Sequence, residues 1–265
     1  MPEGPECRLA TDYLNKIFLH KTITNWVFCG GKYTDTYPEG YKRFDDNLPL
    51  IVSDISCKGK LIYFILQDTN GVKYYILHNP KMTGIWKKKR DNNCKWFVEL
   101  KETKETIWFS DIKGFANLNF INSKNLFNNE LNCLGPDIMR SEFKLPIFKE
   151  LTQKYNNMNI TSFLSNQEII SGCGNYIKSE ALYYAKISPL RKIGSFTLQE
   201  IELLYEALRI ISRISYNNMG FNPTKKYKIP TYISGCKFKI YKQEHAICIK
   251  TADGKTTYWD KKIQN

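Results

Sequence analysis

Residues 51–77, with the sequence IVSDISCKGKLIYFILQDTNGVKYYIL, decide how the first half of the chain is expected to fold. Apolar residues run there in short alternating bursts, and a polar turn sequence, DTNG at 68–71, separates two of them. Bursts of this length bounded by turns are typical of β-strands. The pattern recurs across residues 22–120, with bursts at 51–55, 61–66, 73–77, 96–100 and 106–109. We therefore predict a β-sandwich or barrel for this half.

A helix is predicted ahead of the strands. Leu9, Tyr13 and Ile17 follow one another at four-residue steps, which places them on one face of a helix over residues 6–17. Pro5 suits the first turn of such a helix, because a first-turn N–H has no partner within the helix. The sheet is thus expected to carry one leading helix.

Helical periodicity returns after LGPD at 134–137. The candidate helices are residues 147–155, 160–165, 176–185 and 197–217. Strand character returns near the end of the chain, at 238–241, 246–249 and 256–259, around the hairpin turn ADG at 252–254. The sequence predicts an α+β protein with a sandwich domain at 1–125, a helical domain at 126–234 and a β-hairpin at 235–265.

The charge of the chain points to a polyanionic partner. Lys and Arg number 39 against 26 Asp and Glu, which gives a net charge of +13 over 265 residues. Such an excess favours nucleic acid first and an anionic membrane surface second. Only seven of the 39 basic residues are arginines, so a general bias toward lysine is the alternative explanation.

Two further features bear on the compartment. The chain has no run of about 18 to 20 apolar residues, and MPEGPECRLA at its start lacks the features of a secretory signal. The eight cysteines form no C-x2-C pair, which favours reduced thiols. We therefore expect a soluble intracellular protein.

A set of short motifs stands in one order along nearly the whole chain. They are PEGPE at 2–6, KGKL at 58–61, MTG at 82–84, DIKGF at 111–115, LGP at 134–136, Gln167, GCGNY at 172–176, EAL at 180–182 and Pro189. This ordered set resembles the formamidopyrimidine-DNA glycosylase / endonuclease VIII (Fpg/Nei) family of base-excision repair enzymes. The segment around 172–176 resembles the helix-two-turn-helix of that family, and GKTTYW at 254–259 resembles the end of its finger hairpin.

The resemblance implies a bifunctional DNA glycosylase with AP lyase activity on oxidised bases, with pyrimidines favoured by the Nei-like finger. It implies that Pro2 is the nucleophile and that Glu3 transfers protons. It also implies that Lys60 matches the family's β-strand lysine, which approaches the Pro2 amine and the lesion phosphate from the opposite side of the site. Once Met1 is removed, Pro2 is a secondary amine ahead of a helix, whose dipole favours the neutral, nucleophilic form. Glu6 matches a second family carboxylate, or it only interacts with the helix dipole. No cofactor is needed, because the amine serves as the electron sink.

The resemblance also implies residues that contact DNA. Met82, Lys113 and Phe115 match the three side chains that fill the gap left by a flipped base. Core packing is the alternative for Met82 and Phe115. Asp111, Lys113 and Phe115 alternate, so on an extended segment they would project to one side. Lys113 stands where the family usually has arginine, and loses the bidentate guanidinium fork.

Two phosphate contacts complete the implied interface. Asn175 lies where the family's helical turn binds a phosphate, with an ordinary helix cap as the alternative. Lys255 takes the place of the finger arginine.

The finger departs from the zinc-bearing members, which carry two C-x2-C pairs. A zinc site from Cys236, His245, Cys248 and Asp260 is conceivable, but the pattern favours a zincless finger and no metal.

Several questions stay open at this level. A non-catalytic binder of damaged DNA, with the same scaffold and charge, is the alternative function. The segment from Gly220 to Lys228 does not settle whether purines or pyrimidines are preferred. We expect a monomer whose partner is DNA with oxidised bases or abasic sites, in a DNA-containing compartment. KKKR at 87–90 is either a nuclear import signal or a solvated loop.

Overall fold

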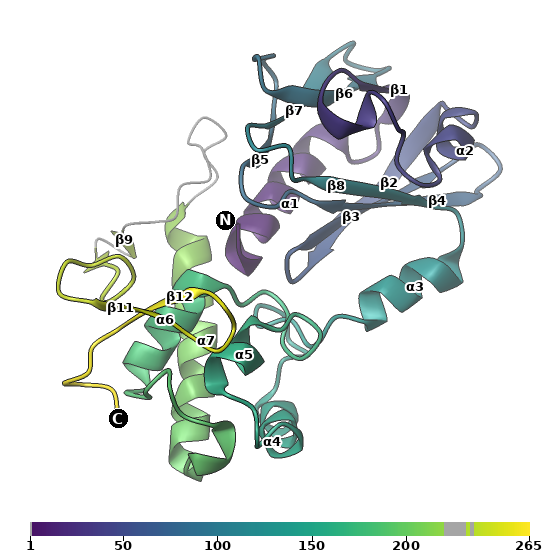
Figure 1. Cartoon of the computed structure of the whole chain (residues 1–265). Coiled ribbons are helices and arrows are strands. Elements are labelled where there is room, and N and C mark those ends of the chain that lie inside the picture. Colours follow the sequence, from purple (N-terminus) through teal and green to yellow (C-terminus); the bar gives the residue numbers. More distant parts are fainter. Residues whose placement is uncertain (1, 220–231, 234–235) are drawn as a thin grey trace. The chain divides into compact units, whose positions relative to one another are not determined.

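An eight-stranded antiparallel sheet forms most of the first unit in the computed structural model, which describes residues 2–219, 232–233 and 236–265 (Figure 1). Its strands are β1 (Thr22–Phe28), β2 (Leu50–Lys58), β3 (Leu61–Gln67), β4 (Lys73–Asn79), β5 (Gly84–Lys87), β6 (Cys94–Leu100), β7 (Thr106–Asp111) and β8 (Asn117–Ile121). Their order across the sheet is β5-β7-β6-β1-β2-β3-β4-β8. The five apolar bursts predicted as strands are confirmed.

Aromatic contacts close this sheet on itself. Trp86 of β5 and Phe120 of β8 come from opposite edges of the strand order, yet each ring centroid lies 5.8 Å from that of Trp26 in β1. Both contacts are edge-on, an arrangement that aromatic pairs prefer. The two halves of the sheet therefore face one another across a shared core, and the predicted β-sandwich is confirmed.

Helix α1 (Gly4–Phe18) supplies one edge of this core, and the predicted leading helix is confirmed. Leu14 and Phe18 are fully buried, and Phe18 meets the rings of Phe64 and Trp86 edge-on. The unit also contains the short helices η1 (Gly31–Tyr33) and α2 (Tyr41–Asp45).

Helix α3 (Lys124–Asn132) packs on the outer side of the sheet, where the sequence analysis had placed only a domain boundary. Phe127 stacks on Tyr75 of β4 with ring centroids 4.4 Å apart. The Lys58 ammonium donates a hydrogen bond to the Leu131 carbonyl, 3.0 Å away, in the last turn of α3. Lys58 therefore helps to hold α3 against the sheet.

The second unit is mainly helical. It contains α4 (Leu145–Lys154), α5 (Ile160–Ser165), α6 (Asn175–Tyr184), η2 (Ile193–Ser195), α7 (Leu198–Met219), β9 (Tyr232–Ile233), β10 (Cys236–Lys237), β11 (Ile247–Lys250) and β12 (Thr256–Trp259). All four predicted helices are confirmed. By their contacts, residues 3–5 belong to this unit together with residues 133–219 and the described residues from 232 onward, whereas residues 2 and 6–132 form the first unit.

The last thirty residues fit the prediction in part. Strands β11 and β12 pair as an antiparallel hairpin, and Gly254 in its turn has φ of +71°, which favours glycine. The strand predicted at 238–241 is wrong. The N–H groups of Lys239, Ile240 and Tyr241 instead donate to the Glu180 carboxylate at 3.0, 2.9 and 2.7 Å. A side chain has replaced the neighbouring strand as their partner. Residues 220–228, considered for the purine question, lie outside the described residues.

Within the described parts of the chain, no helix has the length and apolar character needed to cross a membrane.

His78 is an ionisable group in the sandwich core. It is fully buried, with its ring edge-on to Trp86, Trp96 and Phe109. Burial lowers the pKa of His78 to about 4, against an ordinary value of 6.5, although a contact with the Asn117 carbonyl opposes the shift. The imidazole is therefore neutral in the folded protein at neutral pH.

This burial predicts a loss of stability in mild acid. Between pH 6.5 and pH 4 the unfolded chain binds a proton at His78 that the folded chain does not, so unfolding becomes more favourable as the pH falls. The penalty at pH 4.5 is about 2 kcal/mol relative to pH 7. His78→Gln removes the titration. Denaturant unfolding at both pH values is expected to give a smaller acid-induced loss for the variant than for the wild type. Equal losses would contradict this account.

Candidate functional site

Pro2 lies just ahead of α1 and borders a small cavity of the first unit. The other residues that line the cavity are Glu6, Cys7, Ala10, Ile62, Pro80, Gly84 and Trp86. Glu6, in the first turn of α1, is buried. Pro80 and Gly84 flank the turn that carries Met82. The structure thus brings Pro2 and Glu6 together with the base of the Met82 loop.

Lys60 lies in the turn between β2 and β3, beside the same end of α1. Its carbonyl accepts a hydrogen bond from the Cys7 thiol at 3.7 Å. Lys60 and Pro2 are therefore both located near the first turns of this helix.

Glu3 occupies the N-terminus of α6. Its side chain is buried, with the N–H of Tyr176 donating to Oε1 at 2.9 Å and that of Ile177 donating to Oε2 at 3.2 Å. These two N–H groups have no acceptor within their own helix, and the positive end of the helix dipole favours an anion there. The helix holds the carboxylate at a fixed place.

The glycine before α6 makes this arrangement possible. A Cβ on Gly174 would lie 2.2 Å from the Glu3 carboxyl carbon, which is closer than two non-bonded atoms can approach. The Gly4 N–H also donates to the Gly172 carbonyl at 2.8 Å. The GCG sequence at 172–174 therefore accommodates the start of the chain.

The three residues expected to fill a base gap are all exposed. Met82 and Phe115 are 45% and 54% exposed, which excludes core packing for both, and Lys113 is also exposed. Alternation predicted that Asp111 projects to the same side as Lys113 and Phe115, and this prediction is wrong. The chain turns at Gly114, where φ is +66°, and Asp111 points into the protein.

Asp111 joins the two loops that carry these side chains, a role that the sequence analysis missed. Its buried carboxylate accepts from the Thr83 hydroxyl of one loop and from the N–H groups of Lys113 and Ala116 in the other, the latter two at 3.2 and 2.9 Å. A buried Asp with three donors fixes the loops relative to each other.

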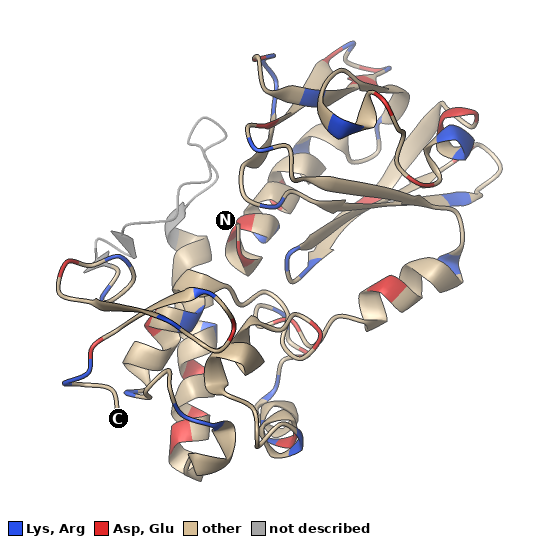
Figure 2. Cartoon of the chain, viewed as in Figure 1, with Lys and Arg blue, Asp and Glu red and all other residues tan. Residues whose placement is uncertain are grey.

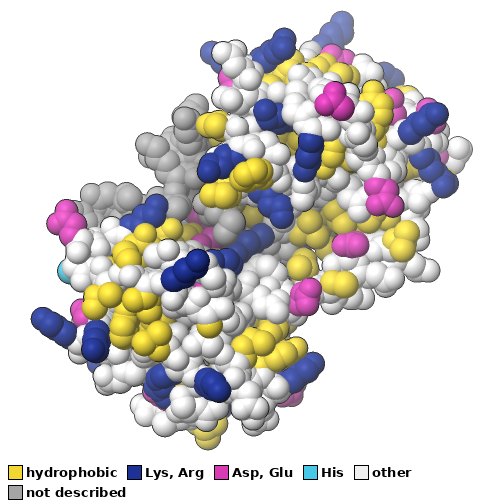
Figure 3. All heavy atoms as spheres, in the orientation of Figure 1, with side chains coloured by type: hydrophobic (Ala, Val, Ile, Leu, Met, Phe, Trp, Pro, Cys, Tyr) yellow, Lys and Arg dark blue, Asp and Glu magenta, His cyan; other side chains and the backbone are white. Residues whose placement is uncertain are grey.

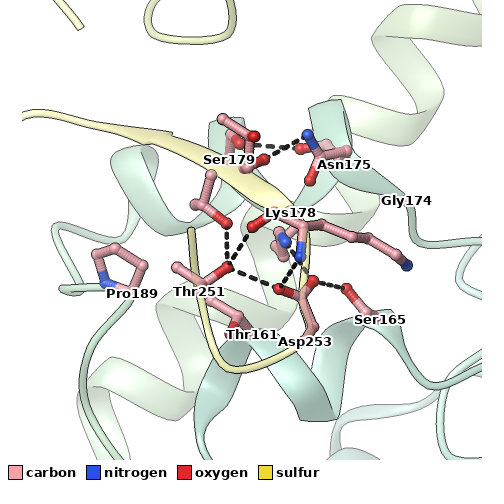
Figure 4. Close-up of polar contacts among 12 residues, drawn as sticks. Thr161, Ser165, Gly174, Asn175, Lys178, Ser179, Pro189, Thr251 and Asp253 are labelled. Atoms are coloured by element: carbon pink, nitrogen blue, oxygen red, sulfur yellow. Dashed lines mark hydrogen bonds and ion pairs between the residues drawn. The ribbon is translucent and has the colours of Figure 1, made fainter. Parts of the chain in front are cut away.

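Asn175 and Lys255 lie close together in the second unit. Asn175 begins α6 but does not cap it; its side-chain Nδ2 donates to the Thr256 carbonyl of β12 at 2.6 Å (Figure 4). The ordinary helix cap is therefore excluded. Lys255 directly precedes Thr256 and is partly exposed.

Tyr241 belongs to the same region and was missed, because its segment was predicted as a strand. Burial, then the nearby Glu3 carboxylate, raise the pKa of Tyr241 to about 12, opposed by a hydrogen bond with Asn175. The phenol is therefore protonated at neutral pH. No spacing signal in the sequence could have revealed it.

Basic side chains are spread over the visible face of each unit, with acidic ones among them (Figures 2 and 3). In the run at 87–90, Lys87 pairs with Asp91, Lys88 lies 2.6 Å from Glu105, and Arg90 lies over Trp108.

Among the described residues, no three His, Cys, Asp or Glu side chains converge as metal ligands. His245 and Cys248 are exposed, and the Asp260 carboxylate accepts from the Lys262 N–H at 2.8 Å. The side chain of Cys236 lies outside the described residues. Among the described residues, His245, Cys248 and Asp260 therefore do not converge on one position.

Known proteins share this architecture. Residues 134–217 match the model of the formamidopyrimidine-DNA glycosylase H2TH domain. The chain is 24% identical to endonuclease 8 of Enterobacter sp. (strain 638) over 94% of its own length and 90% of the relative. It is 27% identical to the formamidopyrimidine-DNA glycosylase of Wolbachia pipientis over the full length of both.

Solved structures agree in fold. The MutM (Fpg) protein of Thermus thermophilus superimposes with a TM-score of 0.80 at 21% identity, covering 99% of this chain and 98% of that one. MutM in complex with DNA containing carbocyclic 8-oxo-G gives a TM-score of 0.85 at 19% identity over the whole of both chains. A β-sandwich with a leading helix, followed by a helix-two-turn-helix unit, defines the class of fold. Over nearly its whole length the chain is similar to proteins named endonuclease 8 and formamidopyrimidine-DNA glycosylase, and its helical unit matches the H2TH domain model of the latter.

The contact between Gly174 and Glu3 gives a test of the site. Gly174→Ala is expected to destabilise the protein by roughly 1–3 kcal/mol, because the new methyl group collides with the Glu3 carboxyl. In a Glu3→Ala background the same change should cost much less. Denaturant unfolding of the two single variants and the double variant measures the coupling. Additive effects would show that Gly174 is required for another reason.

Proposed function

We propose that the chain is a bifunctional DNA glycosylase with AP lyase activity that removes oxidised bases. The observation that carries the proposal is the buried Glu3 carboxylate, held by two backbone N–H groups of α6 directly after Pro2 in the chain. Such a carboxylate is fixed beside the residue that becomes a terminal secondary amine once Met1 is removed. The names of the relatives support the same activity.

The chemistry follows from these two groups. The Pro2 nitrogen attacks C1′ of the damaged nucleotide, and the bond from C1′ to the base breaks. Glu3 donates a proton to the sugar ring oxygen as the ring opens, which gives an iminium ion. Loss of a C2′ proton then expels the 3′ phosphate, and a second elimination expels the 5′ phosphate. Lys60 lies near the N-terminus of α1, which Pro2 precedes, and is suited to binding the lesion phosphate.

The exposed loops suit the extrusion of a base. Rotating a nucleotide out of a duplex costs a few kcal/mol of stacking and pairing, which a filled gap partly recovers. Met82, Lys113 and Phe115 are exposed on loops that Asp111 joins, so they are preorganised to enter a duplex as a set. We assign Asn175 and Lys255 to the backbone phosphates; their proximity in the second unit supports this assignment. We infer oxidised pyrimidines as the favoured substrates, because the finger sequence resembles that of the Nei-like branch.

Blocking the N-terminus tests the nucleophile. Keeping Met1 in place turns the Pro2 nitrogen into an amide, which has no nucleophilic lone pair. Lesion DNA should still bind, because phosphate contacts dominate affinity, but base release and borohydride-trapped adduct should fall by roughly a hundredfold or more. Glu3→Gln serves as a comparison, since it should bind DNA and fail to release the base.

Two results would contradict the proposal. A blocked protein that cleaves abasic sites at the full rate would exclude Pro2, and Lys60 would become the leading candidate. Wild-type protein that binds lesion DNA without any trapped adduct would favour the non-catalytic binder.

The finger gives a separate prediction about metal. Because the finger sequence lacks the two C-x2-C pairs of the zinc-bearing members, we expect EDTA to leave base release and the melting temperature unchanged. Stoichiometric zinc in purified protein, measured by elemental analysis, would overturn the zincless assignment.

A further inference from the structure

A buried ion pair joins α6 to the turn of the β11–β12 hairpin. Lys178 Nζ lies 2.5 Å from Asp253 Oδ2, and the two side chains are 0% and 4% exposed. Asp253 also accepts from the hydroxyls of Ser165 and Thr251, each at 2.6 Å (Figure 4). These three donors all belong to the second unit.

The carboxylate is ionised at neutral pH. Burial alone would raise the pKa of Asp253, but hydrogen bonds from Lys178, Ser165 and Thr251 outweigh burial and lower it. Burial lowers the pKa of Lys178, and Asp253 opposes that shift. Removing one partner of such a pair leaves a buried charge without compensation, which is strongly unfavourable.

The pair is close in the chain to the two residues proposed to bind phosphate. Lys178 follows Asn175 by three positions on α6, and Asp253 precedes Lys255 by two in the hairpin. The Lys255 N–H donates to Asp253 at 3.3 Å, and Asn175 donates to Thr256 at 2.6 Å. Asp253 and Thr256 lie on either side of Lys255 in the chain. The ion pair to Asp253 and the hydrogen bond from Asn175 to Thr256 therefore both fix this part of the hairpin to α6.

We propose that Lys178 is a positioning residue for DNA binding, which neutralises Asp253 and holds the hairpin turn so that Lys255 reaches a backbone phosphate. This inference rests on the proposed function, because it assigns Lys255 to the bound DNA. Lys178 itself makes no phosphate contact, since its side chain is fully buried. Without Lys178, the Asp253 carboxylate would stand uncompensated two residues from Lys255 and would repel a phosphate.

Salt dependence separates this role from a merely structural one. The affinity for a duplex with an abasic-site analogue is measured by titration between roughly 50 and 300 mM salt, a range over which phosphate contacts are screened. Lys255→Ala should lower the log-log slope by about 0.9, the value of one phosphate contact. Lys178→Met should lower it by the same amount, although the side chain is buried. Lys178→Arg, which keeps the charge, should retain most of the slope.

Two further variants complete the design. In the double variant Lys178→Met/Lys255→Ala, the affinity should fall no more than about twofold below that of Lys255→Ala, because the contact is already lost. Lys149→Met is the matched control. It removes one charge from the same unit by breaking the exposed Lys149–Glu202 pair, and it should leave the slope unchanged.

Thermal melts of all variants give the structural comparison. A Lys178→Met protein with a lower melting temperature but the wild-type slope would overturn the inference. Additive losses in the double variant would overturn it too. If Lys178→Met does not fold, Asp253→Asn breaks the same pair and loosens the turn. It is expected to lower the slope by a smaller amount, because no carboxylate remains near Lys255 to repel a phosphate. An unchanged slope in this variant would overturn the inference.

The outcome is distinguishable from failure of the proposed function. If wild-type protein traps no adduct, the glycosylase proposal fails whatever the slopes are. If wild-type protein traps adduct while Lys178→Met matches the Lys149→Met control in affinity and slope, only the positioning role fails.

Discussion

The N–H groups that begin α6 have no partners in their own helix, and the way they are satisfied organises the second unit. The Glu3 carboxylate accepts two of them, and this is possible only because Gly174 carries no Cβ. The carboxylate of the proposed chemistry is thus held by backbone donors and not by the donor groups of flexible side chains. Geometry of this kind is what preorganised catalysis requires.

Further along the same helix, side chains fix the hairpin. Asn175 binds the Thr256 carbonyl, Lys178 pairs with Asp253, and Glu180 accepts three successive N–H groups ahead of β11. A two-stranded hairpin is marginal on its own in water. Here buried polar contacts from one helix hold it, so α6 both orients a carboxylate and supports the surface proposed to bind phosphate.

The first unit uses a different principle. Its core is aromatic, and contacts such as Trp26 with Trp86 join the two edges of one sheet. The buried carboxylate of Asp111 serves positioning, because it joins two loops whose apolar residues stay exposed. Met82 and Phe115 leave apolar surface exposed to water, and insertion into DNA would bury it.

Local pattern by itself determined the leading helix, five of the sandwich strands, the four helices and the turn at Gly254, because periodicity and turn chemistry act over a few residues. The ordered motifs pointed to the family, and they marked Pro2, Glu3, Lys60, Asn175 and Lys255 as candidates. Tertiary structure alone decided which partners those residues meet. Residues 238–241 look like a strand in sequence, but a carboxylate 59 to 61 positions away takes their N–H groups. The roles of Asp111, Lys178 and Tyr241 likewise depend on contacts between distant segments, and such contacts leave no period in the sequence.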